Sequence, residues 1–464
     1  MDDIIDELSW RGLLADTTDI EELRKALGSG RVTFYAGYDP TAPGLHIGNL
    51  ALVLTMRRLQ LGGHRPIGLI GGATGLIGDP SGKSAERALN PIGTVAGWVE
   101  RIRGEVARFL DFEAGESSAL IVSNLEWTAP MHVLEFLRDI GKHFSVNRML
   151  DRESVKARLE AGGISYTEFS YQLLQAMDYL ELHRRYDCTL QLGGSDQWGN
   201  LVAGVDLIRR AEGASVHALA IPLITKADGT KYGKTEGGAI WISPDLMSPY
   251  AFYQFWLNVA DAEVPGLLRV YSFKSREEIQ ELTRQTIERP AARIGQRALA
   301  EELTTLVHGS AQARQAIAAS QAAFGQAEPA QLARPTWAAM TEELPRALFT
   351  WSSFAASNAS HGGAPPTTLN SATAASEPVS SGRAGIFSIV GPSIASLMVS
   401  AGTAPTLSAA RRAIAEGGVY LNNKRVTSID RVLNPDDLYY ERYALLRRGK
   451  RTVAVVVRDD GEQG

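Results

Sequence analysis

The sequence predicts an α/β protein in which a parallel sheet wrapped by helices is followed by a helical region and a small α+β domain. Three observations carry this prediction. Short β-rich segments alternate with helical patterns early in the chain, residues 249–347 have a helical pattern throughout, and residues 387–464 combine a short helix, a hairpin and a β-branched strand. Alternating strands and helices favour a parallel sheet, because each crossover needs a helix.

Local patterns predict the individual elements. Residues 32–35 are β-rich and run into a turn at 39–44 that contains prolines and glycine. Apolar residues at helical spacing then predict a helix from about His46. Residues 66–70 and 119–122 are short apolar runs typical of buried strands. Further helices are predicted at residues 166–182, 250–257, 277–288, 291–307, 311–323 and 408–417.

Residues 352–384 differ sharply in composition from the rest of the chain. Of these 33 residues, 25 are Ser, Thr, Ala, Gly or Pro, and only Glu377 and Arg383 are charged. Such a segment buries too little apolar surface to offset its ordering entropy, so we predict a flexible linker and a domain boundary. The predicted divisions are residues 1–224 for the sheet, 225–350 for a lysine-rich loop and the helices, 351–386 for the linker, and 387–464 for the last domain.

Composition bounds the class of protein. The 464 residues carry a net charge of −5, with 44% apolar and 21% charged residues, which argues against wholesale disorder. The single cysteine, Cys188, favours a reducing, cytoplasmic setting. An acidic start and the lack of a long apolar run predict neither secretion nor a membrane span. From Phe387 onward, 11 Lys and Arg against 8 Asp and Glu hint at a polyanionic partner, although a solvated surface explains this equally well.

The helix start at His46 is a candidate phosphate site. A helix N-terminus presents unpaired N–H groups and partial positive charge, and His46 and Asn49 share one face. Gly48 would let a ligand approach the backbone. An ordinary N-cap histidine is the alternative, which the residues themselves leave open.

The glycine-rich stretch at residues 71–84 invites a nucleotide-loop interpretation that its spacing rejects. It ends in Gly82, Lys83 and Ser84, like a P-loop, but Ile77 stands where a P-loop requires glycine. The Gly-x-Gly-x-x-Gly dinucleotide pattern also fails. A P-loop NTPase is therefore disfavoured.

Two later segments offer polar groups. One face of the predicted helix 166–182 carries Tyr171, Gln175 and Asp178, and residues 191–199 follow with Asp196 and Gln197. A solvated helix face explains most such rows, but amides and carboxylates near glycine turns favour a pocket for a polar ligand. Residues 226–235 hold three lysines on a loop, which suits binding of polyphosphate during a reaction.

Four stretches in this order, residues 35–49, 72–83, 191–200 and 231–235, closely resemble the bacterial tyrosyl-tRNA synthetases, a class I family. The resemblance covers the chain except for the linker. Residues from about Phe387 resemble the RNA-binding fold named after small ribosomal-subunit protein four.

The resemblance implies a Rossmann-like catalytic domain, an α-helical anticodon-arm domain and a C-terminal RNA-binding domain. It implies activation of L-tyrosine by ATP to tyrosyl-adenylate and pyrophosphate, followed by transfer of tyrosine to the terminal adenosine of tRNA(Tyr). Magnesium would arrive with ATP rather than in a protein metal site, and no prosthetic group is expected. A cytoplasmic homodimer is also implied.

The resemblance further assigns roles to residues. The catalytic donors toward phosphate and pyrophosphate would be Thr41, His46, Asn49, Lys83, Arg87, Lys231, Lys234 and Thr235. The tyrosine site would comprise Tyr35 and Asp178 at the phenolic hydroxyl, Asp79, Tyr171 and Gln175 at the ammonium group, and Gln197 near the carboxylate. The ATP site would comprise Asp39, Gly48, Gly193, Asp196, which would bind the ribose, and Lys234.

Two rival hypotheses remain. A tryptophanyl-tRNA synthetase shares the scaffold, but Tyr35 with Asp178 and the C-terminal domain argue against it. A synthetase-like protein without catalysis is disfavoured because His46, Lys231 and Lys234 are intact.

Overall fold

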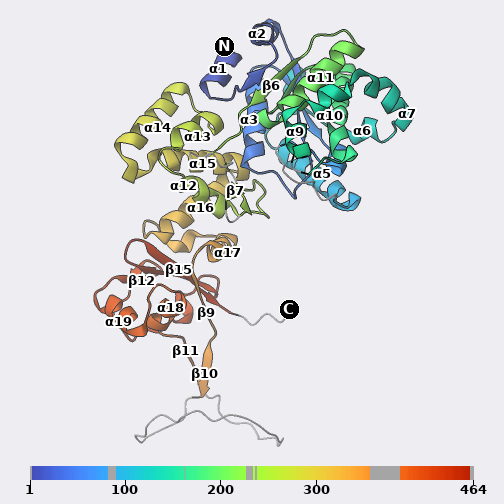
Figure 1. Cartoon of the computed structure of the whole chain (residues 1–464). Helices are drawn as coiled ribbons and strands as arrows, with labels where there is room; N and C mark the ends of the chain where they lie inside the picture. The colour runs from blue at the N-terminus through green and yellow to red at the C-terminus, as the bar shows by residue number, and fades with distance from the viewer. Residues whose placement is uncertain are drawn as a thin grey trace, which may run out of the picture. The chain divides into compact units, whose positions relative to one another are not determined.

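The computed structural model describes residues 3–81, 90–160, 162–225, 232, 234–235, 238–355 and 387–459. The chain divides into two compact units, Met1–Ala313 and Arg314–Gly464, and each has a sheet of its own (Figure 1). The α/β fold class predicted from the sequence is confirmed.

The first unit is built on a six-stranded sheet in the order β1-β6-β5-β2-β3-β4. Its strands are β1 (Asp16–Thr17), β2 (Thr33–Tyr38), β3 (Arg65–Ile70), β4 (Leu120–Ser123), β5 (Cys188–Gly194) and β6 (His217–Ile221). All neighbours pair in parallel except β1, which runs antiparallel to β6 at the edge. The strands expected at 32–35, 66–70 and 119–122 are confirmed, whereas local patterns did not single out β5 and β6.

Strand order reverses between β2 and β5. From β2 the chain moves one way to β3 and β4, and from β5 it moves the other way to β6. The two central strands align Tyr35 with Gln191 and Ala36 with Leu192. In open parallel sheets, ligands bind beyond the carboxyl ends of the strands at such a reversal. This edge is therefore where the fold predicts a binding site.

Helices cover both faces of this sheet. Those of the sheet region are α1 (Ile4–Trp10), α2 (Ile20–Ser29), α3 (Ile47–Leu61), α4 (Thr74–Ile77), α5 (Ile92–Ala107), α6 (Leu125–Thr128), α7 (Val133–Glu135), α8 (Val146–Leu150), α9 (Glu153–Glu160), α10 (Tyr166–Tyr186) and α11 (Trp198–Ala211). One core cluster joins Tyr35 and Ile67 of the sheet to Met177 of α10 and Leu207 of α11. A Cβ on Gly68, which alternates with Ile67, would instead meet Val106 of α5, so α5 packs on the opposite face.

A helical region follows within the same unit. It comprises α12 (Pro249–Leu257), α13 (Val264–Tyr271), α14 (Arg276–Glu288) and α15 (Ile294–His308). The predicted helices at 250–257, 277–288 and 291–307 are confirmed. Short polar residues set the helix starts: the Ser248 side chain caps α12 ahead of a proline, and Ser275 forms a capping box with Glu278 on α14.

The second unit contains a five-stranded sheet in the order β13-β12-β14-β15-β9. Its strands are β9 (Arg346–Phe349), β12 (Val419–Leu421), β13 (Lys424–Arg425), β14 (Tyr443–Arg448) and β15 (Thr452–Arg458), and its helices are α17 (Arg334–Glu343), α18 (Ile394–Ser400) and α19 (Leu407–Ala415). The predicted hairpin is present, with Asn422 and Asn423 at positive φ in its two-residue turn. A further helix, α16 (Ser310–Ala323), spans the boundary between the units.

The unit boundary differs from the predicted domain boundary after residue 350. Strand β9, expected to belong with the helices, pairs in parallel with β15 about 100 residues later, so residues 314–349 group with the second unit. Local sequence patterns carry no signal for such a distant pairing. At the margins of the predicted linker, β10 (Ser352–Ala355) pairs antiparallel with β11 (Phe387–Val390), and residues 356–386 lie outside the described residues.

Among the described residues, no helix combines the length and apolar character that a membrane crossing requires.

Candidate active site

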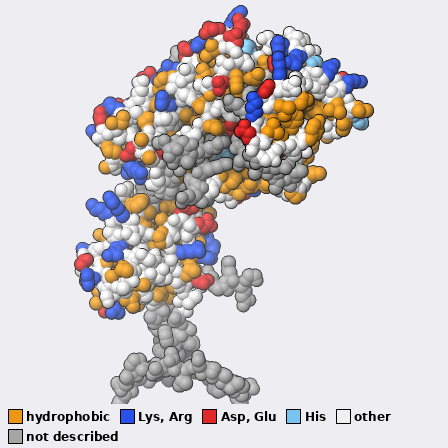
Figure 2. Space-filling view, viewed as in Figure 1, with side chains coloured by type: hydrophobic (Ala, Val, Ile, Leu, Met, Phe, Trp, Pro, Cys, Tyr) orange, Lys and Arg blue, Asp and Glu red, His pale blue; other side chains and the backbone are white. Residues whose placement is uncertain are grey.

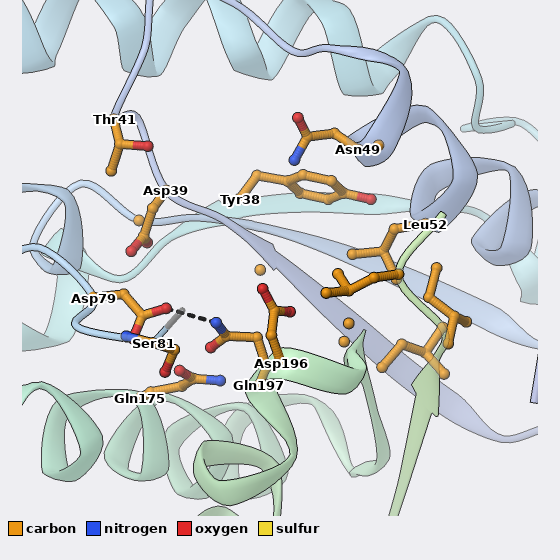
Figure 3. A pocket seen from close by; sticks show the side chains of 18 of the residues that line it. Tyr38, Asp39, Thr41, Asn49, Leu52, Asp79, Ser81, Gln175, Asp196 and Gln197 are labelled. Atoms are coloured by element: carbon orange, nitrogen blue, oxygen red, sulfur yellow. Dashed lines mark hydrogen bonds between the residues drawn. The ribbon is translucent and has the colours of Figure 1, made fainter. Parts of the chain in front are cut away.

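A cavity of about 490 Å³ opens at the carboxyl ends of β2 and β5, where the strand order reverses. Side chains reach it from β2, from the N-terminus of α3, from the turn after β3, from α10 and from the segment after β5 (Figure 3). The predicted site residues that line it are Tyr35, Asp39, Thr41, His46, Gly48, Asn49, Asp79, Tyr171, Gln175, Asp178, Gly193, Asp196 and Gln197. Segments far apart in the chain thus meet in one hollow.

The side chains of the other predicted site residues are not described by the structure. Lys83, Arg87 and Lys231 lie outside the described residues. Lys234 and Thr235 form strand β7 (Lys234–Thr235), which pairs antiparallel with β8 (Gly238–Ala239), and only their backbone is described.

His46 is the N-cap of α3, and it forms a capping box with Asn49. The Gly48 amide donates to His46 Nδ1 over 3.1 Å, and the His46 amide donates to Asn49 Oδ1 over 3.1 Å. Because Nδ1 accepts a hydrogen bond, the proton of the neutral ring resides on Nε2. The cap therefore orients both side chains. It uses His46 Nδ1 and Asn49 Oδ1 as acceptors and does not involve the donors His46 Nε2–H and Asn49 Nδ2–H.

Gly48 has a structural role beside the one that the sequence suggested. A Cβ at this position would lie 2.9 Å from the His46 ring. Glycine is thus required to make room for the imidazole, whether or not a ligand also approaches the backbone there.

A desolvated carboxylate lines the cavity. Asp178 on α10 is buried, and it accepts hydrogen bonds from Asn124 Nδ2 at 2.9 Å and from Trp127 Nε1 at 2.8 Å. Burial raises the pKa of Asp178 to about 7; the two hydrogen bonds lower the pKa, and the charges of Asp39 and Glu181 raise it.

The Tyr35 hydroxyl is buried without a hydrogen-bond partner among the described residues. Its ring packs against Tyr179 with centroids 5.3 Å apart, and burial together with the charge of Asp178 raises its pKa. A buried unpaired hydroxyl costs free energy, so a polar ligand atom that pairs with it would be favoured.

A chain of hydrogen bonds links Asp178 to Asp39 through Asn124 and Thr74. Asp39 accepts from the hydroxyls of Tyr171 at 2.6 Å and Thr74 at 2.7 Å, and Thr74 in turn accepts from Asn124 Nδ2 at 2.9 Å. The glycine turn after β3 makes this approach possible, since any Cβ on Gly71 would collide with the Asp39 carboxylate.

A second set of hydrogen-bonded polar residues is centred on Asp79. Gln197 Nε2 donates to Asp79 Oδ2 over 2.6 Å, and the Ser81 amide donates to Asp79 Oδ1 over 3.0 Å (Figure 3). Gln197, which was expected near a substrate carboxylate, thus uses one of its N–H donors in a hydrogen bond to Asp79. The Gln175 oxygen is buried without a hydrogen-bond partner among the described residues, and Asp196 projects into the same space from the 3₁₀ turn Ser195–Gln197.

Sequence reasoning missed the residues that hold these side chains in place. Asn124 and Trp127 fix Asp178, Thr74 bridges Asp39 to Asn124, and Asn200 donates to Gln197 Oε1 over 3.0 Å. Asn124 offered one available signal: it comes two residues after the end of the predicted strand at 119–122, and the residues after parallel strands converge at one sheet edge.

Comparison with known proteins identifies the family. A model of the class I tRNA synthetases (W and Y) matches residues 28–325, and a model of the SYY-like C-terminal domain of tyrosine–tRNA ligases matches residues 389–456. The chain belongs to the class I tRNA synthetases.

Relatives that match over nearly the whole chain show which activity within the family applies. The chain is 55% identical over 458 residues, 98% of this chain and 99% of the relative, to the tyrosine–tRNA ligase of Streptomyces coelicolor. It is 51% identical over 461 residues, 99% and 100%, to that of Acidothermus cellulolyticus. A truncated mitochondrial tyrosyl-tRNA synthetase of Coccidioides posadasii superposes with a TM-score of 0.60 at 31% identity, over 68% of this chain and 91% of that one. The predicted family and the predicted activity, ligation of tyrosine to tRNA, are confirmed.

The resemblance assigns Asp178 to the tyrosine site, and on that assignment its raised pKa predicts that tyrosine binding depends on pH. Only the ionised carboxylate accepts with both oxygens, so we expect the dissociation constant for tyrosine to rise as pH falls through about 7. Trp127→Phe removes a hydrogen bond that lowers this pKa and should move the midpoint to higher pH. Equilibrium dialysis of labelled tyrosine across a pH series measures it, with Trp10→Phe as the control; equal midpoints in both variants would contradict the assignment.

Proposed function

We propose that this cavity binds tyrosine and ATP side by side and aligns them for adenylate formation. The observation that carries the proposal is the joint placement of an unpaired Tyr35 hydroxyl, the desolvated Asp178 and the capped N-terminus of α3 around one hollow. One end suits a phenol and the other suits phosphate, as the reaction requires.

Tyrosine binds with its hydroxyl between Tyr35 and Asp178. The phenolic O–H donates to the Asp178 carboxylate, and its oxygen accepts from the unpaired Tyr35 O–H. Phenylalanine would leave the Tyr35 hydroxyl buried and unsatisfied, which costs about 1–3 kcal/mol, and would give Asp178 no hydrogen bond beyond those from Asn124 and Trp127. The substrate ammonium group then faces Asp79, the Gln175 oxygen and the Tyr171 hydroxyl, while the carboxylate extends past Gln197 toward ATP.

Adenylate formation needs alignment rather than a nucleophilic side chain. A carboxylate oxygen of tyrosine forms a bond to the α-phosphorus of ATP, and the bond from that phosphorus to the bridging oxygen breaks, releasing pyrophosphate. His46 Nε2–H and Asn49 Nδ2–H donate to phosphate oxygens as negative charge redistributes. Thr41, Lys83, Arg87, Lys231, Lys234 and Thr235 add donors and positive charge, and Mg²⁺ enters bound to the ATP phosphates.

The rest of the nucleotide occupies the other side of the reversal. Asp196 binds the ribose hydroxyls, and Gly193 and Gly48 let the nucleotide lie against the backbone. Asp39 orients this region through its hydrogen bonds to Tyr171 and Thr74. The reaction takes place in the cytoplasm, a reducing compartment that suits a free, buried cysteine such as Cys188.

The domain roles remain as predicted from the sequence: residues 1–224 catalyse, helices within 225–350 contact the anticodon arm, and residues 387–464 bind tRNA(Tyr). Exposed basic residues in the second unit support the last role. They include Arg411, Arg412, Lys424, Lys450 and Arg451. Positive charge attracts RNA phosphates without requiring a particular base sequence.

A homodimer is supported by exposed apolar side chains between residues 133 and 150. Leu134 is 81% exposed and Val133 is 73% exposed, and Leu137, Val146 and Leu150 are exposed as well. Hydrophobic side chains gather on the face of the first unit where α10 and α7 are seen in Figure 1 (Figure 2). Such a concentration of exposed apolar side chains is unfavourable in water unless another surface covers it. A second copy of the same patch would do so with twofold symmetry.

We expect exchange of pyrophosphate into ATP to depend on tyrosine and to be unsupported by phenylalanine or tryptophan. Asp178→Asn replaces one acceptor oxygen by a donor, so it should raise the KM for tyrosine by about 10-fold or more, with the KM for ATP little changed. Exchange assays with each amino acid measure both effects. Exchange supported equally by tryptophan would refute the substrate assignment.

We expect Arg411→Gln with Arg412→Gln, and separately Lys450→Gln with Arg451→Gln, to weaken tRNA charging and to reduce its salt dependence, while pyrophosphate exchange stays normal. Substitution is preferable to truncation at residue 387, because truncation would remove β15 from its pairing with β9. Charging kinetics across a salt series measure the effect, and an unchanged salt response in both variants would contradict RNA binding by this unit.

We expect Leu134→Glu to shift the protein from dimer toward monomer, because a charge at the centre of an apolar interface must be desolvated. Sedimentation measured across a concentration series tests this. Leu61→Glu, at another exposed apolar position, is the matched control. A dissociation constant unaltered by Leu134→Glu would place any dimer interface elsewhere.

A further inference from the structure

The backbone around His46 is joined to the segment that follows the lysine loop. The Ile47 amide donates to the Ile240 carbonyl and the Ile242 amide donates to the Leu45 carbonyl, each over 3.0 Å. His46 and Trp241 face each other in this antiparallel bridge. The β7–β8 hairpin, which carries Lys234 and Thr235, leads directly into it, so the position of His46 and the base of the hairpin depend on each other.

A buried carboxyl group on α5 supports this junction from behind. Glu105 is 1% exposed, and its Oε2 accepts a hydrogen bond from the Leu45 amide over 2.7 Å. The fit is close, since a Cβ on Gly44 would lie 3.0 Å from Glu105 Oε1. The Leu45 amide therefore has a fixed partner one residue before His46.

The same helix also holds the segment after the bridge. Arg101, one turn before Glu105, forms an ion pair with Asp245 at 2.7 Å, and the Ser243 hydroxyl donates to Asp245 over 2.5 Å. Burial raises the pKa of Glu105, while the Leu45 amide, Ser243, Arg108 and Arg101 act to lower it. Helix α5 thus contacts Leu45, next to one partner of the bridge, and Asp245, in the segment that follows the other partner.

We propose that Glu105 is a positioning residue for adenylate formation, because it holds the Leu45 amide and α5 together and thereby sets the place of His46 relative to the β7–β8 hairpin. The inference rests on the function proposed above for His46 and Lys234. Glu105 itself lies outside the residues that line the cavity and touches no reacting atom.

Energetics favour this role over simple packing. A buried carboxyl group is costly unless its hydrogen bonds are made, and an apolar side chain would fill the same volume without that cost. What an apolar side chain could not supply is an acceptor for the Leu45 amide, which would then be buried and unpaired. Misplacing a positioned catalytic donor by about 1 Å can cost about 100-fold in rate.

The test uses the full chain with three substitutions. Glu105→Ala removes the acceptor, Glu105→Gln keeps an amide oxygen for Leu45, and Glu100→Ala changes an exposed residue on the same helix as the control. Pyrophosphate exchange gives kcat and the KM values for tyrosine and ATP, and thermal unfolding reports folding.

We expect Glu105→Ala to lower kcat by about 10- to 100-fold with the KM for tyrosine within about twofold of the wild type. Glu105→Gln should recover most of that loss, and Glu100→Ala should behave as the wild type. If Glu105→Ala does not fold, Gly44→Ala serves instead, since its Cβ presses on the Glu105 carboxyl group and should lower kcat with the tyrosine KM unchanged.

A folded Glu105→Ala protein with wild-type kcat would overturn the inference, as would failure of Glu105→Gln to restore kcat in a stable protein. If Glu105→Ala does not fold, an unaltered kcat in Gly44→Ala would overturn it too. His46→Ala separates this from failure of the proposed function. Loss of exchange in His46→Ala beside normal exchange in Glu105→Ala would refute only the role of Glu105, whereas normal exchange in His46→Ala would refute the site assignment itself.

Discussion

The reversal of strand order between β2 and β5 is the constraint on which the site depends. All the parallel strands end at one edge of the sheet, so the residues that follow them are brought together however far apart they are in the chain. Asp39 follows β2, Asn124 follows β4 and Asp196 follows β5. Helices α3 and α10 then point a capped N-terminus and a polar face at the same edge. The cavity is a consequence of this topology before any ligand is considered.

Buried polar groups would give that cavity its selectivity in the proposed function. Asp178 remains tolerable in a desolvated position because Asn124 and Trp127 donate to both of its oxygens. The Tyr35 hydroxyl is left unpaired by the described residues, and this unsatisfied group is an energetic preference for a ligand that can pair with it. In the proposed function, a substrate is therefore selected partly by whether it supplies a hydrogen-bond partner to the Tyr35 hydroxyl.

His46 shows how a structural role and the proposed chemical role are compatible in one side chain. The sequence left two interpretations open, an ordinary N-cap and a donor to phosphate. The capping box uses Nδ1 of His46 and Oδ1 of Asn49 as acceptors. The hydrogen-bond donors of the two side chains, Nε2–H and Nδ2–H, take no part in the cap. The same two hydrogen bonds stabilise the helix and fix the orientation of both side chains, so the two interpretations do not exclude each other.

The sequence by itself determined the elements and most of the residues that meet in the cavity. Apolar runs predicted β2, β3 and β4, polar caps and periodicity predicted the helices, and the four motif stretches carried the family and its activity. Only the tertiary structure decided what supports those residues. Asn124 and Trp127 behind Asp178, Glu105 behind Leu45, and β9 beside β15 are pairings between residues distant in the chain. Local patterns record only what a residue's sequence neighbours require, whereas these contacts exist because the folded sheet and helices bring remote groups within hydrogen-bond distance.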